Sequence, residues 1–277
     1  MKIITDTSTF YSPAEGRELG ITVIPSCAVI RGKVYRDYED IDTEGLLKRV
    51  KAGDIPTTSQ PSIGDVMDAF GDDDGEEILF LSIGDGLSGT YQNAVGVKNG
   101  MEDGDRVHVV DTKTLGGPQR YLVQKAMRLR DEGLPLEKIK KEIMEGIETS
   151  VSFVIPADFE FLKRSGRLTA VAARIGSVIK IVPVLTQTED KKRIAPFAIK
   201  RSMKKAVEAI INHLKSIGVD ENYMISISHA GVKRIAENVL DQIRVQFANT
   251  AFELYQLSPA LVTHGGPGCV VIQAIRK

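Results

Sequence analysis

Short apolar runs alternate with amphipathic segments in the first half of the chain. The runs at 78–83 and 107–110 have the length and the polar boundaries of buried strands. The amphipathic segments begin with helix-start signals, such as Ser12 followed by Pro13 and Glu15. This repeated strand–helix order predicts a mostly parallel sheet with helices on its faces.

The pattern of apolar positions changes in the second half of the chain. Expected strands at 181–186 and 193–198 flank a charged turn at 189–192, which is typical of an antiparallel hairpin. Residues 169–179 are expected to be helical, and a Gly-rich turn at 262–268 is expected before the final strand. These features predict a mixed sheet.

Together the two patterns predict an α/β protein with two domains, which its 277 residues can accommodate. Residues 1–149 are expected to form an α/β domain with the mostly parallel sheet, and residues 150–277 an α/β domain with the mixed sheet. This boundary, near Thr149, is soft. The final strand could return to the cleft between the domains.

One strand–helix connection stands out as a candidate anion site. Gly84, Gly86 and Gly89 permit a tight turn after the strand, and Ser88 lies at the start of the next helix. The first N–H groups of a helix lack intrahelical acceptors and lie at the positive end of its dipole. The connection is therefore suited to a phosphate or carboxylate group.

The residues of this connection are also compatible with simpler roles. Ser88 can serve as a helix cap alone, and the glycines can serve the turn alone. The glycines also spell G-x-G-x-x-G, and Asp111 ends the next apolar run, about where a ribose-binding acid would lie. A nucleotide-dependent oxidoreductase is therefore the alternative function. A P-loop fits poorly because no Lys follows the glycines as such a loop requires. The nucleophile elbow of a hydrolase fits poorly because the loop lacks the G-x-S-x-G spacing.

Composition and targeting signals exclude several classes of protein. The formal net charge of −1 argues against a nucleic-acid partner, and no apolar run approaches the ~20 residues of a membrane span. Cys27 and Cys269 form no C-x-x-C pair, and the histidines show no metal-ligand spacing. Asp6 comes too early for a secretory signal. We expect a soluble cytoplasmic protein without a metal or an organic cofactor.

Three segments combine hydroxyl groups or histidine with Gly or Pro and contain no charged residue: 57–62, 88–91 and 263–268. The first two precede expected helices, so they should meet at the carboxyl edge of the parallel sheet, where such sheets bind ligands. His264 is the titratable candidate, although a hydrogen bond within its own turn would account for it equally well. Such a cleft is more typical of a binding protein than of an enzyme.

The order of six motifs resembles that of the DegV family of bacterial fatty-acid-binding proteins. Each motif is weak alone, but the ordered set is specific and spans nearly the whole chain. The motifs are Thr5-Asp6-Thr7-Ser8, Thr58-Ser59-Gln60-Pro61-Ser62, Leu87-Ser88-Gly89-Thr90-Tyr91, Phe161-Leu162-Lys163-Arg164-Ser165-Gly166-Arg167, Pro183-Val184-Leu185 and Thr263-His264-Gly265-Gly266-Pro267-Gly268.

The resemblance implies that one long-chain fatty acid lies between the two α/β domains. It also implies a carrier subunit, not an enzyme, whose fatty acid is phosphorylated to acyl phosphate by a separate fatty acid kinase for phospholipid synthesis. Contact with a membrane surface would be transient. By motif position, Thr58 and Ser88 are expected to contact the carboxyl group of the fatty acid, with Ser59, Gly89 and His264 nearby.

The resemblance further implies a docking face for the kinase. Arg167 and Arg201 match basic positions of that face, and both are expected to be exposed. No Lys or Arg is then expected beside the bound carboxyl group, so its pKa should rise toward that of a neutral acid. The chain departs from the family pattern at Asp85-Gly86, which replaces a Ser-Ser pair and creates the G-x-G-x-x-G pattern.

Overall fold

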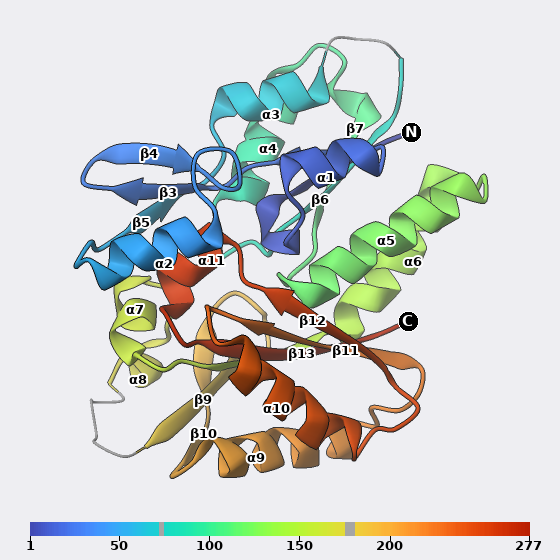
Figure 1. The fold of residues 1–277 in the computed structure, drawn as a ribbon. Coiled ribbons are helices and arrows are strands. Elements are labelled where there is room, and N and C mark those ends of the chain that lie inside the picture. Colours follow the sequence, from blue (N-terminus) through green and yellow to red (C-terminus); the bar gives the residue numbers. More distant parts are fainter. Residues whose placement is uncertain (72–74, 175–180) are drawn as a thin grey trace.

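The computed structural model describes residues 1–71, 75–174 and 181–277, and it places a parallel sheet in the first half of the chain (Figure 1). The strands of this sheet are β1 (Lys2–Asp6), β2 (Thr22–Ile24), β6 (Ile78–Ser82) and β7 (Val107–Asp111). They lie in the order β2-β1-β6-β7, and every neighbouring pair is parallel. The expected parallel sheet is confirmed.

A mixed sheet of six strands forms in the second half of the chain. Its strands are β8 (Val151–Ile155), β9 (Val182–Gln187), β10 (Ile194–Lys200), β11 (Tyr223–His229), β12 (Ala251–Gln256) and β13 (Val270–Arg276). The order is β10-β9-β8-β13-β11-β12, in which β11 and β12 are parallel and the other pairs are antiparallel. The α/β class and the β9–β10 hairpin are confirmed. The final strand lies at the centre of this sheet.

A small antiparallel sheet packs beside the parallel one. Its strands are β3 (Cys27–Ile30), β4 (Lys33–Arg36) and β5 (Thr57–Ser59). β3 pairs with both neighbours, and Thr58 lies opposite Ala28. Segment 57–62 is expected to lie before a helix at the edge of the parallel sheet. It does precede a helix, but its residues Thr57–Ser59 form a strand of this separate sheet, paired with residues 27–29.

Helices cover both faces of the parallel sheet. They are α1 (Pro13–Glu18), α3 (Ile63–Phe70), α4 (Thr90–Gly100), α5 (Gly117–Asp131) and α6 (Leu136–Thr149), with short 3₁₀ helices at η1 (Thr7–Thr9) and η2 (Gly104–Arg106). α3 and α4 bury Phe70 and Ala94 against Phe80 on one face. On the other face, α5 and α6 pack against the parallel sheet and also against Met224 and Ile275 of the mixed sheet (Figure 1).

The remaining helices surround the mixed sheet. They are α2 (Thr43–Lys51), α7 (Phe159–Arg164), α8 (Ala170–Ala173), α9 (Met203–Ser216), α10 (Lys233–Arg244) and α11 (Pro259–Gly265). α9 and α10 cover one face, burying Ile210 and Val239 against Phe153 and Ile225. α2 and α11 lie between the small sheet and the mixed sheet (Figure 1).

Two expected elements of the second half differ from the structure. The turn expected at 262–268 is instead largely the helix α11, because Pro259 at its first position favours a helix start. The chain leaves this helix through Gly266, whose φ is 77°. Of the helix expected at 169–179, α8 covers Ala170–Ala173, and residues 175–180 lie outside the described residues.

The proposed domain boundary at 149/150 falls between α6 and β8. Ser150 is the single residue that separates the two elements, and its side chain is buried. The core that contains α5 and α6 includes residues of both sheets, as the presence of Leu79 and Ile275 in one cluster shows. A two-domain division therefore remains a prediction.

Candidate ligand-binding site

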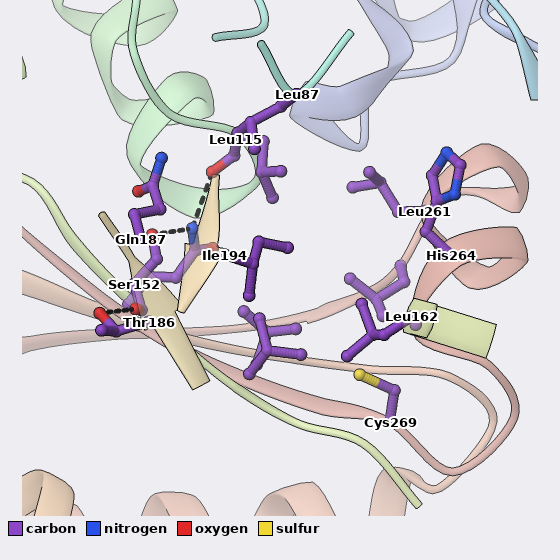
Figure 2. Close-up of a pocket in the computed structure, with 15 residues that line it drawn as sticks. Leu87, Leu115, Ser152, Leu162, Thr186, Gln187, Ile194, Leu261, His264 and Cys269 are labelled. Carbon is purple, nitrogen blue, oxygen red and sulfur yellow. Dashed lines mark hydrogen bonds between the residues drawn. The ribbon is translucent and has the colours of Figure 1, made fainter. Parts of the chain in front are cut away.

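An apolar cavity lies between the mixed sheet and the loops that follow β6 and β7 (Figure 2). The empty space between its walls, including space open to solvent, is about 610 Å³. Strands β8, β10 and β13 and helices α7 and α11 contribute to its walls. The apolar lining residues are Leu87, Leu115, Val154, Leu162, Ile194, Leu257, Leu261, Cys269 and Val271. Such a lining is suited to a hydrocarbon group.

Polar side chains line this cavity at the end opposite His264 (Figure 2). Gln273 Nε2 donates a hydrogen bond of 2.9 Å to Ser152 Oγ, and Thr186 Oγ1 donates one of 2.8 Å to the Ser152 carbonyl oxygen. Gln187 Nε2 likewise donates to backbone carbonyl oxygens. Because these donors already have acceptors in the protein, this end of the cavity does not require a polar ligand group.

A second, more polar cavity adjoins the first, with about 1050 Å³ of empty space that includes space open to solvent. The two share six lining residues: Leu87, Leu115, Leu162, Ile194, Leu261 and His264. All five residues expected to lie at the ligand carboxyl group line this second cavity: Thr58, Ser59, Ser88, Gly89 and His264. The structure therefore brings together residues from β5, from the start of α4 and from α11.

His264 is paired with a distant residue of the sequence. Its Nε2 atom lies 2.9 Å from Thr58 Oγ1, so the expected alternative of a hydrogen bond within its own turn is wrong. Burial, together with the nearby Arg167 cation, lowers the pKa of His264 to about 3. The imidazole is therefore neutral near pH 7 and acts as a hydrogen-bonding group without charge.

The depressed pKa of His264 predicts a loss of stability in acid. The unfolded chain takes up the proton near pH 6.5, whereas folded His264 takes it up near pH 3, so stability is lost as pH falls through this interval. Between pH 7 and pH 5 this difference corresponds to about 2 kcal/mol of unfolding free energy. We expect His264→Gln to remove that part of the pH dependence in urea denaturation at the two pH values. An unchanged difference between pH 7 and pH 5 would contradict the assignment.

The start of α4 offers unused backbone donors to the polar cavity. Ser88 Oγ lies 2.9 Å from Thr90 Oγ1, while Gly89 at the N-cap provides no side-chain cap. In the part of the chain that the structure describes, no acceptor pairs with the N–H groups of Tyr91 and Gln92. These donors and the helix dipole favour an anion at this end.

Arg167 also lines the polar cavity, and the expectation that it is exposed is wrong. Its Nε donates a hydrogen bond of 3.0 Å to the Leu87 carbonyl oxygen, and a second guanidinium nitrogen donates to the Ser165 carbonyl oxygen. These bonds fold the side chain inward, and burial lowers the pKa of its guanidinium group. Within the described residues, no carboxylate forms an ion pair with it. A cation is therefore available for an anionic ligand.

Arg201 has a different environment. It follows β10 and precedes α9, and its side chain is exposed, as expected. It does not line either cavity. The two arginines that the motif order grouped together therefore lie in different surroundings, and a role in partner docking remains a prediction for both.

The first two glycines of the G-x-G-x-x-G loop serve packing within the protein. A Cβ atom at Gly84 would lie 3.0 Å from the backbone of Lys113, and one at Gly86 would lie 2.7 Å from the Lys192 carbonyl oxygen. Asp111 Oδ1 accepts hydrogen bonds from the N–H groups of Asp85 and Lys113. The glycines therefore permit a close approach of neighbouring backbone, and Asp111 fixes the loop.

Several cavity residues escaped the sequence analysis. Gln60 lines the polar cavity and packs against Gly89, where a Cβ atom would lie 1.9 Å from Gln60 Oε1. Ser26 and Ser258 line the same cavity. Gln60 belongs to the T-S-Q-P-S motif, which could have identified it, whereas the two serines carry no such signal.

Neither a metal site nor a membrane-spanning helix is found among the described residues. Among residues 1–71, 75–174 and 181–277, no group of three His, Cys, Asp or Glu side chains is placed to hold a metal ion. None of the described helices combines the length and the apolar character needed to cross a bilayer.

Comparisons with known proteins show the family of this chain and agree with its fold. The model of a family described as an uncharacterised protein family, DegV, matches residues 1–277. A DegV domain-containing protein of Caldanaerobacter subterraneus is 29% identical over 268 residues, which cover 96% of this chain and 95% of the relative.

Two solved structures of the family are also similar. A fatty-acid-binding DegV family protein from Thermus thermophilus has a TM-score of 0.88 and 26% identity, over 100% of this chain and 99% of the other. DegV, a fatty-acid-binding protein from Bacillus subtilis, has a TM-score of 0.85 and 27% identity over 100% and 99% of the chains. Because the family model covers the whole chain, this protein belongs to the DegV family.

Proposed function

We propose that the protein binds one long-chain fatty acid, with the hydrocarbon chain in the apolar cavity and the carboxyl group in the polar cavity. The observation that carries this proposal is the continuity of the two cavities, which meet at His264 and Leu261. A single ligand that fits both must be amphipathic, with a long apolar part and a polar end. The fatty-acid binding of the two similar DegV proteins supports this choice of ligand.

Burial of the hydrocarbon chain supplies most of the binding free energy in this proposal. About fourteen methylene groups at ~0.8 kcal/mol each contribute roughly 11 kcal/mol before the costs of association and ordering. The polar groups at the end of the apolar cavity opposite His264 do not oppose this burial, since Gln273 and Thr186 already donate to Ser152. The apolar cavity thus accounts for affinity, and the polar cavity for orientation.

The carboxyl group of the fatty acid would contact Thr58 and Ser88, with Ser59, Gly89 and His264 nearby. The Arg167 guanidinium group, which the sequence analysis expected to be exposed, also lines the polar cavity. A nearby cation favours the ionised form of a carboxyl group. In place of the raised pKa expected from the sequence, we therefore propose that the fatty acid binds as a carboxylate. Each charge-assisted hydrogen bond would contribute about 1.5–3 kcal/mol.

The protein would present this carboxylate to a separate fatty acid kinase, which forms acyl phosphate. A further hollow shares Thr58, Arg167 and His264 with the polar cavity, and it would offer a route to the carboxyl group. Exposed Arg201 would contribute to docking of the kinase. Exposed Ile55, which lines this hollow, is suited to transient contact with a membrane surface. In this role the chain is a carrier in the cytoplasm and not an enzyme.

Native mass spectrometry tests the proposal directly. We expect protein purified from a bacterial host to carry about one fatty acid without added ligand, because the gross gain from burying such a chain is large. Solvent extraction and mass analysis would identify the acyl chain. Protein that carries no acyl chain, and takes up none when palmitate or oleate is added, would contradict the proposal. A bound nucleotide would instead favour the oxidoreductase.

A further inference from the structure

Helix α11 connects the ligand cavities to a buried carboxyl group that contacts the start of the helix. Leu261 and His264 of this helix line both cavities. At the opposite end of the helix, Ser258 occupies the N-cap but makes no side-chain cap bond. The first turn is capped instead by Asp37, which follows β4 and lies 223 residues away in sequence.

Asp37 joins three parts of the fold. Its Oδ1 and Oδ2 atoms each lie 3.2 Å from the Ala260 nitrogen, which donates to them. Thr7 Oγ1 donates to Oδ2 at 3.1 Å and accepts from the Ser26 N–H group at 3.0 Å. The Asp37 side chain is fully buried. This carboxylate therefore links η1 and the segment before β3 to the start of α11.

The position of α11 depends on its two ends. The helix has seven residues, and a helix of this length is not stable on its own. Its C-terminal end is held by the contact of His264 with Thr58, and its N-terminal end by Asp37. Loss of Asp37 would leave the Ala260 N–H group buried without an acceptor, which favours a shift of the helix toward solvent or water entry.

We infer that Asp37 is a positioning residue, which acts through α11 to hold His264 and Leu261 where they accept the ligand. This inference rests on the proposed function for its ligand, a fatty acid. Asp37 itself lines neither cavity, but its partner Ala260 lines the polar one, so its effect on binding passes through the start of α11. Hydrogen bonds thus join Thr7 to Asp37 and Asp37 to the start of α11. The other end of the same helix carries His264, whose contact with Thr58 would hold the head group.

The test compares Asp37→Ala and Asp37→Asn with the unchanged protein. Two quantities are measured after removal of bound lipid: the dissociation constant for palmitate, and the ¹⁵N signals of the His264 ring, assigned with His264→Gln. We expect Asp37→Ala to weaken palmitate binding by about tenfold and to shift the His264 signals. Asp37→Asn keeps an oxygen acceptor for Ala260 and should restore most of the affinity and the original signals.

Ser202→Ala is the matched control, because Ser202 Oγ caps α9, a helix that does not line either cavity. We expect this variant to lower the melting temperature and to leave the palmitate affinity and the His264 signals unchanged. If Asp37→Ala does not fold, Asp37→Ser serves instead. It is one atom shorter than Asp and is expected to lose the Ala260 contact while it keeps a polar group beside Thr7.

The outcomes separate the inference from the proposed function. Absence of palmitate binding in the unchanged protein would overturn the proposed function. Normal palmitate binding with unchanged His264 signals in Asp37→Ala, or in Asp37→Ser, would overturn the positioning role and leave the proposed function intact. Weaker binding with unmoved His264 signals would also overturn it, since the effect would then not pass through α11.

Discussion

The double variant Thr58→Val, Ser88→Ala is expected to bind fatty acid much more weakly and to keep its fold. Both residues line the polar cavity, and each substitution removes a hydroxyl group at nearly constant volume. A ligand carboxylate that loses a buried partner is destabilised by about 1–3 kcal/mol for each one. Isothermal titration calorimetry with delipidated protein measures the change, and circular dichroism reports on the fold.

A matched control replaces a Thr and a Ser away from both cavities, as in Thr188→Val, Ser202→Ala. Thr188 lies at the β9–β10 turn, and Ser202 caps α9. The control should bind fatty acid as the unchanged protein does. If the Thr58 and Ser88 variant also kept full affinity, the carboxyl group would have to lie elsewhere.

Charge reversal at Arg167 is expected to remove the bound lipid. The guanidinium group lies in the wall of the polar cavity and has no carboxylate partner among the described residues. Arg167→Glu would replace this cation with an anion beside the ligand carboxylate. Removal of one partner from a buried charge pair costs about 2–5 kcal/mol, and repulsion adds to that loss. Mass analysis of the purified variant should therefore find little fatty acid.

Arg201→Glu is the natural comparison, because Arg201 is exposed and lines neither cavity. We expect this variant to carry its normal lipid but to form acyl phosphate more slowly with a cognate kinase and ATP, most clearly at low salt. Full turnover at low salt would contradict a docking role for Arg201. Normal lipid content in Arg167→Glu would show that its guanidinium group does not hold the carboxylate.

The parallel half of the fold could be predicted because local signals agreed with the final packing. The strand expected at 78–83 is β6, and the Gly-rich turn after it leads directly to α4. Ser88 lies near the start of this helix, as expected. Continuous apolar runs indicate strands that are buried on both faces, and β6 is fully buried. Sequence periodicity is most reliable in such segments.

The site was less predictable, because its geometry depends on contacts between distant segments. Thr58 does meet Ser88 and His264 around one cavity, but it does so from β5, which pairs with β3 and not with the parallel sheet. Arg167 looked like a surface cation in sequence, and only the carbonyl oxygens of Leu87 and Ser165 turn it inward. No local pattern encodes such acceptors, which come from elsewhere in the fold.

The place of β13 in the mixed sheet has a consequence for biosynthesis. This strand lies between β8 and β11, and Val270 pairs with Ile155 across more than a hundred residues. Its Val271 and Gln273 complete the cavity wall. Since β13 leaves the ribosome after all its partners, the sheet stays open at its centre until then, and nascent chains expose apolar edges that favour aggregation. The apolar cavity therefore forms late, and any ligand must enter it after β13 is in place.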